Sequence, residues 1–131
     1  MTISLNRSES RTTTSTVEPI TLARTIVDMI SDKKGEKIVL SDLRTVTVIA
    51  DFFVISEAPS DRQINALVEH VRDEVKNEFG LLPARIEGRG EDGWVLMDYS
   101  SVVVHLFDPD MRAYYDLEGL WREAPILMRM Q

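Results

Sequence analysis

The segment Asp51-Phe52-Phe53-Val54-Ile55 is apolar at four consecutive positions. A strand that packs on one face alternates apolar and polar side chains, whereas an unbroken apolar run is typical of a strand covered on both faces. The segment therefore predicts a central strand of a sheet with further structure on either side. With 131 residues, 44% of them hydrophobic, the chain is long enough for one such core and too short for two.

Two amphipathic helices are predicted to pack on that sheet. From Pro19 to about Lys33, apolar side chains recur every three or four residues, and a proline suits the first helical turn. Ser60 and Gln63 form a capping box, whose side chains satisfy free backbone donors at a helix start. The apolar stripe that follows ends at Gly80, a residue typical of a helix end.

The remaining predicted elements are short. Strands are expected at residues 37–40, 84–87, 94–97 and 101–107, and a short helix from Asp108-Pro109 to Tyr114 with a further turn at 117–121. The order α-β-β-α-β-β-β-α predicts an α+β domain with a mixed β-sheet and two main helices packed on it. We expect a disordered N-terminal tail at residues 1–15, the domain at 16–124 and a C-terminal tail at 125–131.

The charge of the chain restricts its partners. Asp and Glu number 22 against 15 Lys and Arg, a net charge of −7, and residues 87–123 hold nine acids against three arginines. Nucleic acid is bound chiefly through Lys and Arg, so this acidic region predicts a basic protein as partner, with little direct nucleic-acid contact. No window approaches the roughly 18 apolar residues of a membrane span, and the start lacks a secretory signal, so we expect a cytoplasmic protein without membrane contact.

The sequence offers no convincing catalytic centre, cofactor site or metal site. Cysteine is absent, which excludes thiolate nucleophiles and cysteine-based metal centres. Gly88, Gly90 and Gly93 match the dinucleotide-binding pattern G-x-G-x-x-G. They lead into a strand where that loop would open a helix, so we predict a turn. Ser60 could be imagined as a nucleophile, but its capping role accounts for it. We expect a protein that is not an enzyme.

Asp108 and Asp110 could serve as ligands for a divalent metal, as in nucleotidyl transfer. Pro109 stands between them, and a helix start explains both acids. Capping is therefore the preferred interpretation, and a magnesium-dependent nucleotidyltransferase is the alternative.

Aromatic side chains gather in the acidic region. They are Trp94, Tyr99, Tyr114, Tyr115 and Trp121. Large rings flanked by charge are typical of protein-binding hot spots, although for Trp94 and Tyr114 a place in the core is equally open. His70 is expected to face solvent from its helix. His105 lies in an apolar strand, where a polar ring needs a hydrogen-bond partner or a wet surface, and we favour an interface position for it.

A series of segments resembles the ribosomal silencing factor, or Iojap-like, family. They are Asp51-Phe52-Phe53-Val54-Ile55, Ser60 with Gln63, Glu87-Gly88, Gly93-Trp94-Val95-Leu96-Met97-Asp98-Tyr99, Val103-Val104-His105-Leu106-Phe107 and Arg112-Ala113-Tyr114-Tyr115-Asp116-Leu117-Glu118-Gly119-Leu120-Trp121. The resemblance runs in order from about Leu22 to Ala124. The family has Asp-Tyr-Phe where this chain has Asp51-Phe52-Phe53, and Asp-Tyr-Gly-Asp where it has Asp98-Tyr99-Ser100-Ser101.

The resemblance implies a nucleotidyltransferase-like fold without catalytic residues. It also implies a factor that binds the large ribosomal subunit through ribosomal protein L-fourteen, blocks joining of the small subunit and lowers translation when nutrients are short. Such proteins tend to form homodimers. An acidic surface with aromatic rings suits a basic ribosomal protein, so the implied function agrees with the charge of the chain.

Our hypothesis is a docking face that excludes the small subunit sterically. Its residues are expected to be Trp94, Asp98, Tyr99, His105, Tyr115, Leu117, Glu118 and Trp121. The rings would bury apolar area, while Asp98 and Glu118 would select cationic side chains opposite. An adaptor for a non-ribosomal basic protein is a further alternative.

Overall fold

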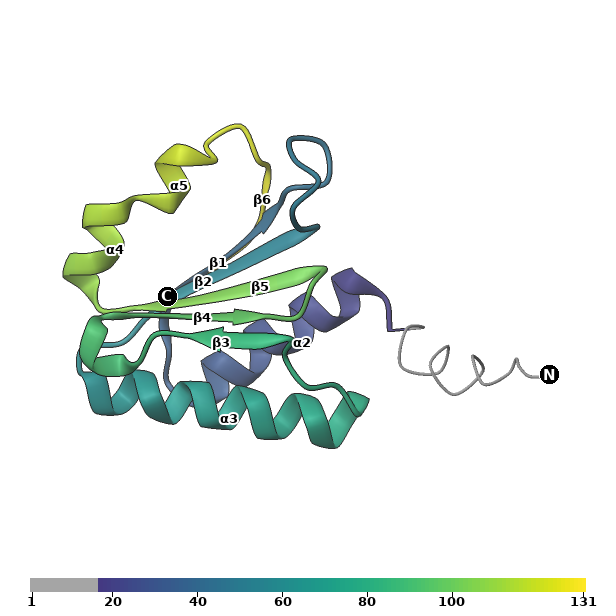
Figure 1. Cartoon of the computed structure of the whole chain (residues 1–131). Helices are drawn as coiled ribbons and strands as arrows, with labels where there is room; N and C mark the ends of the chain where they lie inside the picture. The colour runs from purple at the N-terminus through teal and green to yellow at the C-terminus, as the bar shows by residue number, and fades with distance from the viewer. Residues whose placement is uncertain (1–16) are drawn as a thin grey trace.

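The computed structural model describes residues 17–131 and shows a mixed six-stranded sheet with helices on both faces (Figure 1). The strands are β1 (Glu36–Asp42), β2 (Phe52–Glu57), β3 (Arg85–Glu87), β4 (Trp94–Asp98), β5 (Val102–Phe107) and β6 (Ile126–Met130). The helices are α2 (Pro19–Asp32), α3 (Asp61–Phe79), α4 (Pro109–Tyr115) and α5 (Leu117–Leu120), with a 3₁₀ turn, η1, at Gly90–Asp92. The expected α+β class is confirmed, and the tail expected at residues 1–15 lies outside the described part.

The strand order is β3-β4-β5-β2-β1-β6. β2 and β5 pair in parallel at the centre, and the other neighbours pair antiparallel. A parallel pair needs a long crossover connection, which α3 supplies here together with β3 and β4. The prediction of a central strand at residues 51–55 is correct, since β2 lies between β5 and β1.

The unbroken apolar run of β2 contributes side chains to two separate hydrophobic cores. Phe52 and Val54 belong to the cluster beneath α2 and α3, whereas Phe53 and Ile55 belong to a second cluster on the opposite face. All four side chains are at most 6% exposed. Successive side chains of a strand point to opposite faces, so the sheet has to be covered on both. α2 and α3 cover one face, and α4 and α5 lie over the other (Figure 1).

Helix α3 begins and ends where its sequence predicts, but the structure shows only the Ser60 half of the predicted capping box. The Ser60 hydroxyl oxygen accepts from the backbone N–H of Gln63 at 3.2 Å and donates to the Gln63 side chain at 3.0 Å. Gly80 ends the helix in the left-handed conformation at φ 70°. Within residues 17–131, no helix combines the length and apolar content that crossing a bilayer requires.

The C-terminal residues correct one expectation. Residues 125–131 were expected to be a tail, but β6 forms the sheet edge next to β1, with Leu40 opposite Met128. Backbone bonds from Asp42 to Pro125 and from Lys37 to Gln131, both 2.9 Å, flank the pairing. A short segment of this kind shows little pattern of its own. Its strand conformation depends on the open edge of β1, which only the tertiary structure supplies.

Candidate functional site

The face of the sheet opposite α2 and α3, here called the outer face, carries most of the predicted docking residues. Helices α4 and α5, here called the arm, lie over part of it (Figure 1). Asp108 caps α4 by accepting from the Met111 N–H at 2.7 Å, and Asp116 caps α5 by accepting from the Gly119 N–H at 3.0 Å. These caps fix where the two short helices begin. Three arm-side residues pack on the outer core: Met111, Leu117 and Trp121.

A row of rings connects the sheet to the arm. Trp94 of β4 stacks on Phe107, with ring centroids 5.0 Å apart, and meets Tyr115 at 4.6 Å. Tyr115 in turn contacts Tyr114 edge to face at 5.1 Å. Tyr114 is 77% exposed and Tyr115 is 47% exposed, so the row ends in solvent. Tyr114 is therefore a surface residue, whereas Trp94 packs on Phe107 and is only partly exposed.

His105 lies beneath this row and is only 3% exposed. The indole N–H of Trp94 donates to its Nδ1 at 3.2 Å, and the Phe53 ring lies 4.5 Å away. Burial lowers the pKa of His105 from 6.5 to about 4, because charging the ring would require desolvating the cation. Its Nε2 has no hydrogen-bond partner within residues 17–131. The expectation that this ring needs a partner is thus met at one nitrogen.

Two hollows open on either side of Leu96 on the outer face. One, of about 210 Å³, is lined by Glu87, Gly88, Trp94 and Leu96. The other, of about 170 Å³, is lined by Ile49, Ala50, Phe53, Arg85, Leu96, Asp98, Val103 and His105. Arg85 and Asp98 form an ion pair of 3.4 Å there. The loop before β2 exposes two aliphatic side chains, Val48 and Ile49, of which Ile49 belongs to the lining.

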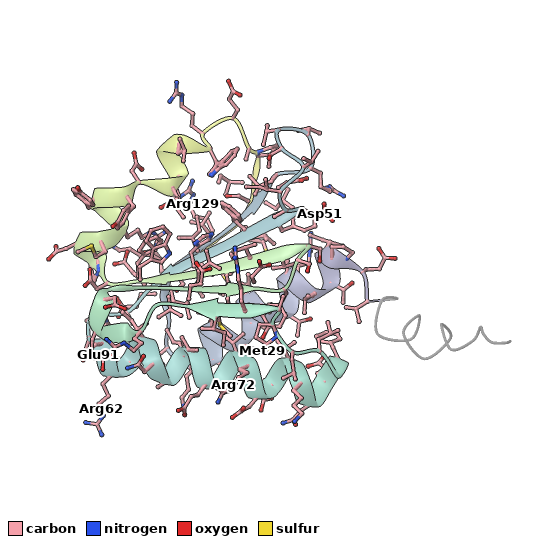
Figure 2. All side chains as sticks on the ribbon, in the orientation of Figure 1. Met29, Asp51, Arg62, Arg72, Glu91 and Arg129 are labelled. Carbon is pink, nitrogen blue, oxygen red and sulfur yellow. The ribbon has the colours of Figure 1, made fainter. Side chains whose placement is uncertain are left out.

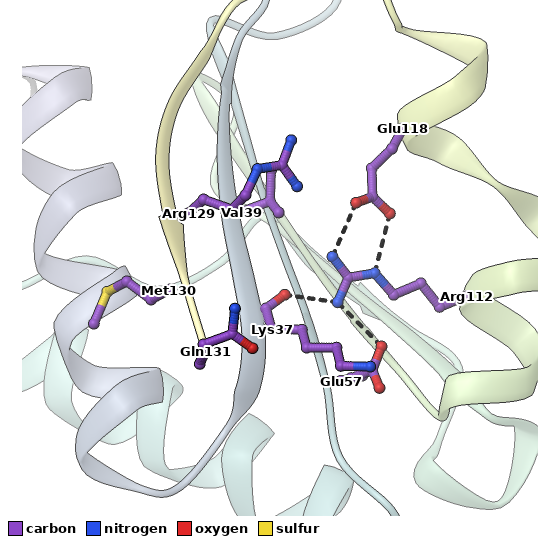
Figure 3. Close-up of a pocket in the computed structure, with 8 residues that line it drawn as sticks. All are labelled: Lys37, Val39, Glu57, Arg112, Glu118, Arg129, Met130 and Gln131. Atoms are coloured by element: carbon purple, nitrogen blue, oxygen red, sulfur yellow. Dashed lines mark hydrogen bonds and ion pairs between the residues drawn. The ribbon is translucent and has the colours of Figure 1, made fainter.

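Arg112 anchors the arm to the far half of the sheet. Its guanidinium contacts two carboxylates, those of Glu118 at 3.0 Å and Glu57 at 3.2 Å, and donates to the Lys37 carbonyl at 2.7 Å (Figure 3). These groups line a hollow of about 310 Å³ beside Arg129. The side chains of Arg112 and Glu57 are about nine-tenths buried, so salt and solvent weaken this ion pair much less than an exposed one.

Three of the predicted docking residues do not lie as the hypothesis requires. Tyr99 is buried in the cluster beneath α2 and α3, on the opposite face of the sheet. Strand β4 places residues 95, 97 and 99 on that face because side chains alternate along a strand. Asp98 and Glu118 each already pair with an arginine of this chain, Arg85 and Arg112 respectively. They are therefore not free to select cations opposite.

The other five residues lie together on the outer face: Trp94, His105, Tyr115, Leu117 and Trp121. His105, for which an interface position was favoured, is buried beneath the rings at 3% exposure. Sequence reasoning missed Arg112, Leu96 and the exposed pair Val48-Ile49 as parts of this face. Two adjacent β-branched residues in a segment without strand alternation were an available signal for the loop. No sequence signal indicated the contacts of Arg112, because Lys37 and Glu57 are far from it in sequence.

The glycine-rich segment is a turn, as predicted. Gly88 and Gly93 adopt positive φ values of 85° and 78°, and η1 lies between them. The Gly90 N–H donates to Asn65 Oδ1 at 2.8 Å. Asn65 also donates to Glu91, which lowers the pKa of that carboxyl, and Glu91 lies beside the start of α3 (Figure 2). The amide that a phosphate would need is thus used to hold the turn against α3.

The acidic pair at the start of α4 has the geometry of a cap. Asp108 accepts from Met111, and Asp110 is exposed in the first turn, where an acid complements the helix dipole. In the described part of the chain, no three or more His, Asp or Glu side chains are grouped so that they could hold a metal ion.

Comparisons with known proteins agree on one family. The model of a family described as "Ribosomal silencing factor during starvation" matches residues 16–130. A ribosomal silencing factor of Halalkalibacterium halodurans is 40% identical over 104 residues, which cover 79% of this chain and 88% of that protein.

Two further relatives extend the comparison. The crystal structure of a Chromobacterium violaceum protein superposes with a TM-score of 0.76 at 31% identity, covering 80% of this chain and 87% of that one. A mouse protein named "Mitochondrial assembly of ribosomal large subunit protein 1" is 37% identical over 73 residues, 54% of this chain and 32% of that protein.

Proposed function

The chain belongs to the ribosomal silencing factor family, and on that premise we propose that it binds the large ribosomal subunit through ribosomal protein L-fourteen. Bound there, it blocks joining of the small subunit by steric exclusion and so lowers translation under nutrient limitation. Two names support the proposal: the family description refers to silencing during starvation, and the mouse relative's name refers to the large ribosomal subunit.

The observation that carries the proposal is the exposed ring surface of the arm. Tyr114 and Tyr115 are 77% and 47% exposed, and Leu120 is 70% exposed. Large exposed apolar side chains on a stable scaffold are typical of protein-binding surfaces. Trp94 contacts Tyr115 from the sheet side, and Trp121 packs on Phe53 of the outer core.

Exposed acidic side chains on and beside the arm give the surface a negative charge. Asp110 in α4, Asp116 between the two helices and Glu123 shortly after α5 are exposed, whereas Asp98 and Glu118 are held in internal ion pairs. We therefore assign the attraction of a basic ribosomal protein to the exposed acids. The two paired acids keep Arg85 and Arg112 in place. A negative, ring-bearing face attracts a cationic protein and repels the phosphates of ribosomal RNA.

The test is cosedimentation with purified large ribosomal subunits, followed by an assay of subunit joining. Tyr115→Ala removes a half-exposed ring without opening the core, and it should weaken binding by about 2 kcal/mol, roughly thirtyfold. Leu82→Ala removes an exposed side chain between α3 and β3 and serves as the matched control, with unchanged binding expected. Equal binding of both variants, or subunit joining that continues at saturating wild-type protein, would contradict the proposal.

We further propose that the protein acts in the cytoplasm as a homodimer. Strand β6 lies at the sheet edge, with Ile126 and Leu127 40% and 39% exposed, and an apolar edge strand readily pairs with another copy. Sedimentation equilibrium should show a dimer, and Leu127→Lys should shift it toward monomer. A monomer at all concentrations would exclude the dimer.

A further inference from the structure

The hydrogen bond between Trp94 and His105 joins the ring surface to the buried core. Strand β4 pairs with β5 so that Trp94 lies opposite Phe107 and diagonal to His105. Diagonal neighbours on one face of an antiparallel pair are within reach of aromatic side chains. The indole N–H of Trp94 thereby donates to His105 Nδ1 at 3.2 Å. His105 is 3% exposed, so it can influence binding only through the residues that it contacts.

This bond determines the protonation of the histidine ring. An indole N–H only donates, so Nδ1 of His105 accepts with its lone pair. A neutral ring then carries its single proton on Nε2. Burial lowers the pKa of His105 to about 4, so the ring is neutral at physiological pH and Nδ1 remains an acceptor for Trp94.

An apolar side chain would fill position 105 at a lower cost. All six residues of β5 are buried, and Nε2 of His105 has no partner within residues 17–131. An unpaired buried N–H costs free energy, which a leucine or a phenylalanine at this position would avoid. What the imidazole offers in their place is one buried acceptor, and Trp94 uses it.

The acceptor selects one orientation of the indole. Trp94 stacks on Phe107 at an interplanar angle of 24° and meets Tyr115 with ring centroids 4.6 Å apart. Stacking fixes the plane of the indole but not its edges, because the χ2 torsion of tryptophan has two broad wells about 180° apart. Rotation between these wells would turn the N–H away from His105. A hydrogen bond of ordinary net strength favours the observed orientation about fivefold.

The orientation decides what Trp94 presents to a partner. The indole nitrogen is the only polar atom of the side chain, and its single proton is bonded to His105. Trp94 therefore has no donor left for a partner and offers it ring carbon. This carbon surface borders the hollow of about 210 Å³ together with Leu96, and it continues to the ring of Tyr115.

We propose that His105 is a positioning residue of the docking surface, which consists of Trp94 and the exposed rings of Tyr114 and Tyr115. From beneath these rings, His105 turns the indole of Trp94 so that a docked protein packs on its carbon atoms and on Tyr115. The role rests on the proposed function, since binding of the ribosomal protein is what this orientation serves.

The orientation is tested in the isolated protein with two variants of equal shape. In His105→Asn the side-chain oxygen lies near the place of Nδ1 and can accept, whereas His105→Leu has the same branched shape without an acceptor. NMR should show that the indole N–H of Trp94 exchanges with solvent about fivefold faster in His105→Leu and within about twofold of wild type in His105→Asn. Trp94→Phe identifies the signal by its loss. Equal exchange in wild type and His105→Leu overturns the positioning role.

Binding to purified large ribosomal subunits tests the consequence. His105→Leu should weaken binding about fivefold, and His105→Asn should bind within about twofold of wild type. A merely structural role predicts the opposite order, because the leucine variant buries no unpaired amide and should be the more stable of the two in urea unfolding. Equal binding of wild type and His105→Leu, or weaker binding of His105→Asn than of His105→Leu, overturns the positioning role.

A double-substitution cycle keeps the test decisive if His105→Asn does not fold. Trp94→Phe retains a ring beside Phe107 and removes the N–H, so adding His105→Leu to it should change binding by less than about twofold. A further loss of about fivefold would show that His105 acts without Trp94 and would overturn the proposal. Failure of wild-type protein to bind large subunits overturns the proposed function and the role of His105 in docking together.

Discussion

Arg112 and Glu118 form a two-point ion pair, with Nε 3.0 Å from one carboxylate oxygen and Nη2 3.0 Å from the other. The same guanidinium reaches Glu57 and the Lys37 carbonyl through Nη1. One side chain of α4 thereby joins α5, β2 and β1. Two helices as short as α4 and α5 are not stable alone, so this contact and the outer core hold the docking surface in place.

Replacing Arg112 should destabilise the fold. Arg112→Met keeps the stem but leaves the carboxylate of Glu57, which is 8% exposed, without its partner, and breaking a buried pair in this way costs about 3 kcal/mol. Urea unfolding at pH 7 measures the loss. Arg44→Met removes a more exposed pair with Asp42 and should cost less than about 1 kcal/mol. Similar values for the two variants would show that burial does not strengthen the Arg112 contacts.

Tyr99→Phe should leave binding to the large subunit unchanged. Tyr99 faces α2 and α3, and its hydroxyl is buried without a partner in the described part of the chain. Burial raises the pKa of Tyr99 to about 12, with a smaller opposing effect from Arg72. Because removing an unpaired buried hydroxyl relieves its desolvation, the free energy of unfolding should stay equal or rise by about 1 kcal/mol. A loss of cosedimentation with the large subunit would show that Tyr99 contributes to binding after all.

Stability should fall with acid through His105. Its pKa is about 4 in the folded protein and about 6.5 when unfolded, so the unfolded state binds the proton more readily. The contribution is present above about pH 6.5 and is lost as the pH falls toward 4, and it amounts to about 3 kcal/mol. Asp98 and Arg85 line the same hollow and remain in both proteins when wild type is compared with His105→Phe. Urea unfolding at pH 7 and pH 4.5 should show that the free energy of unfolding falls more in wild type than in His105→Phe. Equal falls in the two proteins would contradict a buried neutral ring at His105.

Ser100→Gly should stabilise the hairpin between β4 and β5. Ser100 has φ +73°, a left-handed conformation that glycine adopts without strain and that other residues adopt at a cost of about 1 kcal/mol. We expect a gain of about 0.5 to 1 kcal/mol in thermal unfolding. Ser101→Gly, at a position without positive φ, should not stabilise the protein. A gain in thermal stability in both variants would show that backbone strain at Ser100 is not the cause.

Local patterns were sufficient to predict most elements of the fold. The Ser60 cap, the Gly80 end and the Asp108-Pro109 start act within a few residues, so α3 and α4 begin where the sequence indicates. The unbroken apolar run of β2 likewise predicts a strand that is buried on both faces. β6 escaped prediction because its conformation depends on a neighbour that is distant in sequence.

For the site, the sequence determined which side chains exist and the sign of their charge. Only the tertiary structure decided which of them meet: Tyr99 on the inner face, Glu118 in the arginine pair and His105 beneath Trp94. The physical reason is one of range. Capping and side-chain alternation act between near neighbours, whereas ion pairs, ring contacts and hollows form between segments that the sheet brings together from distant parts of the chain.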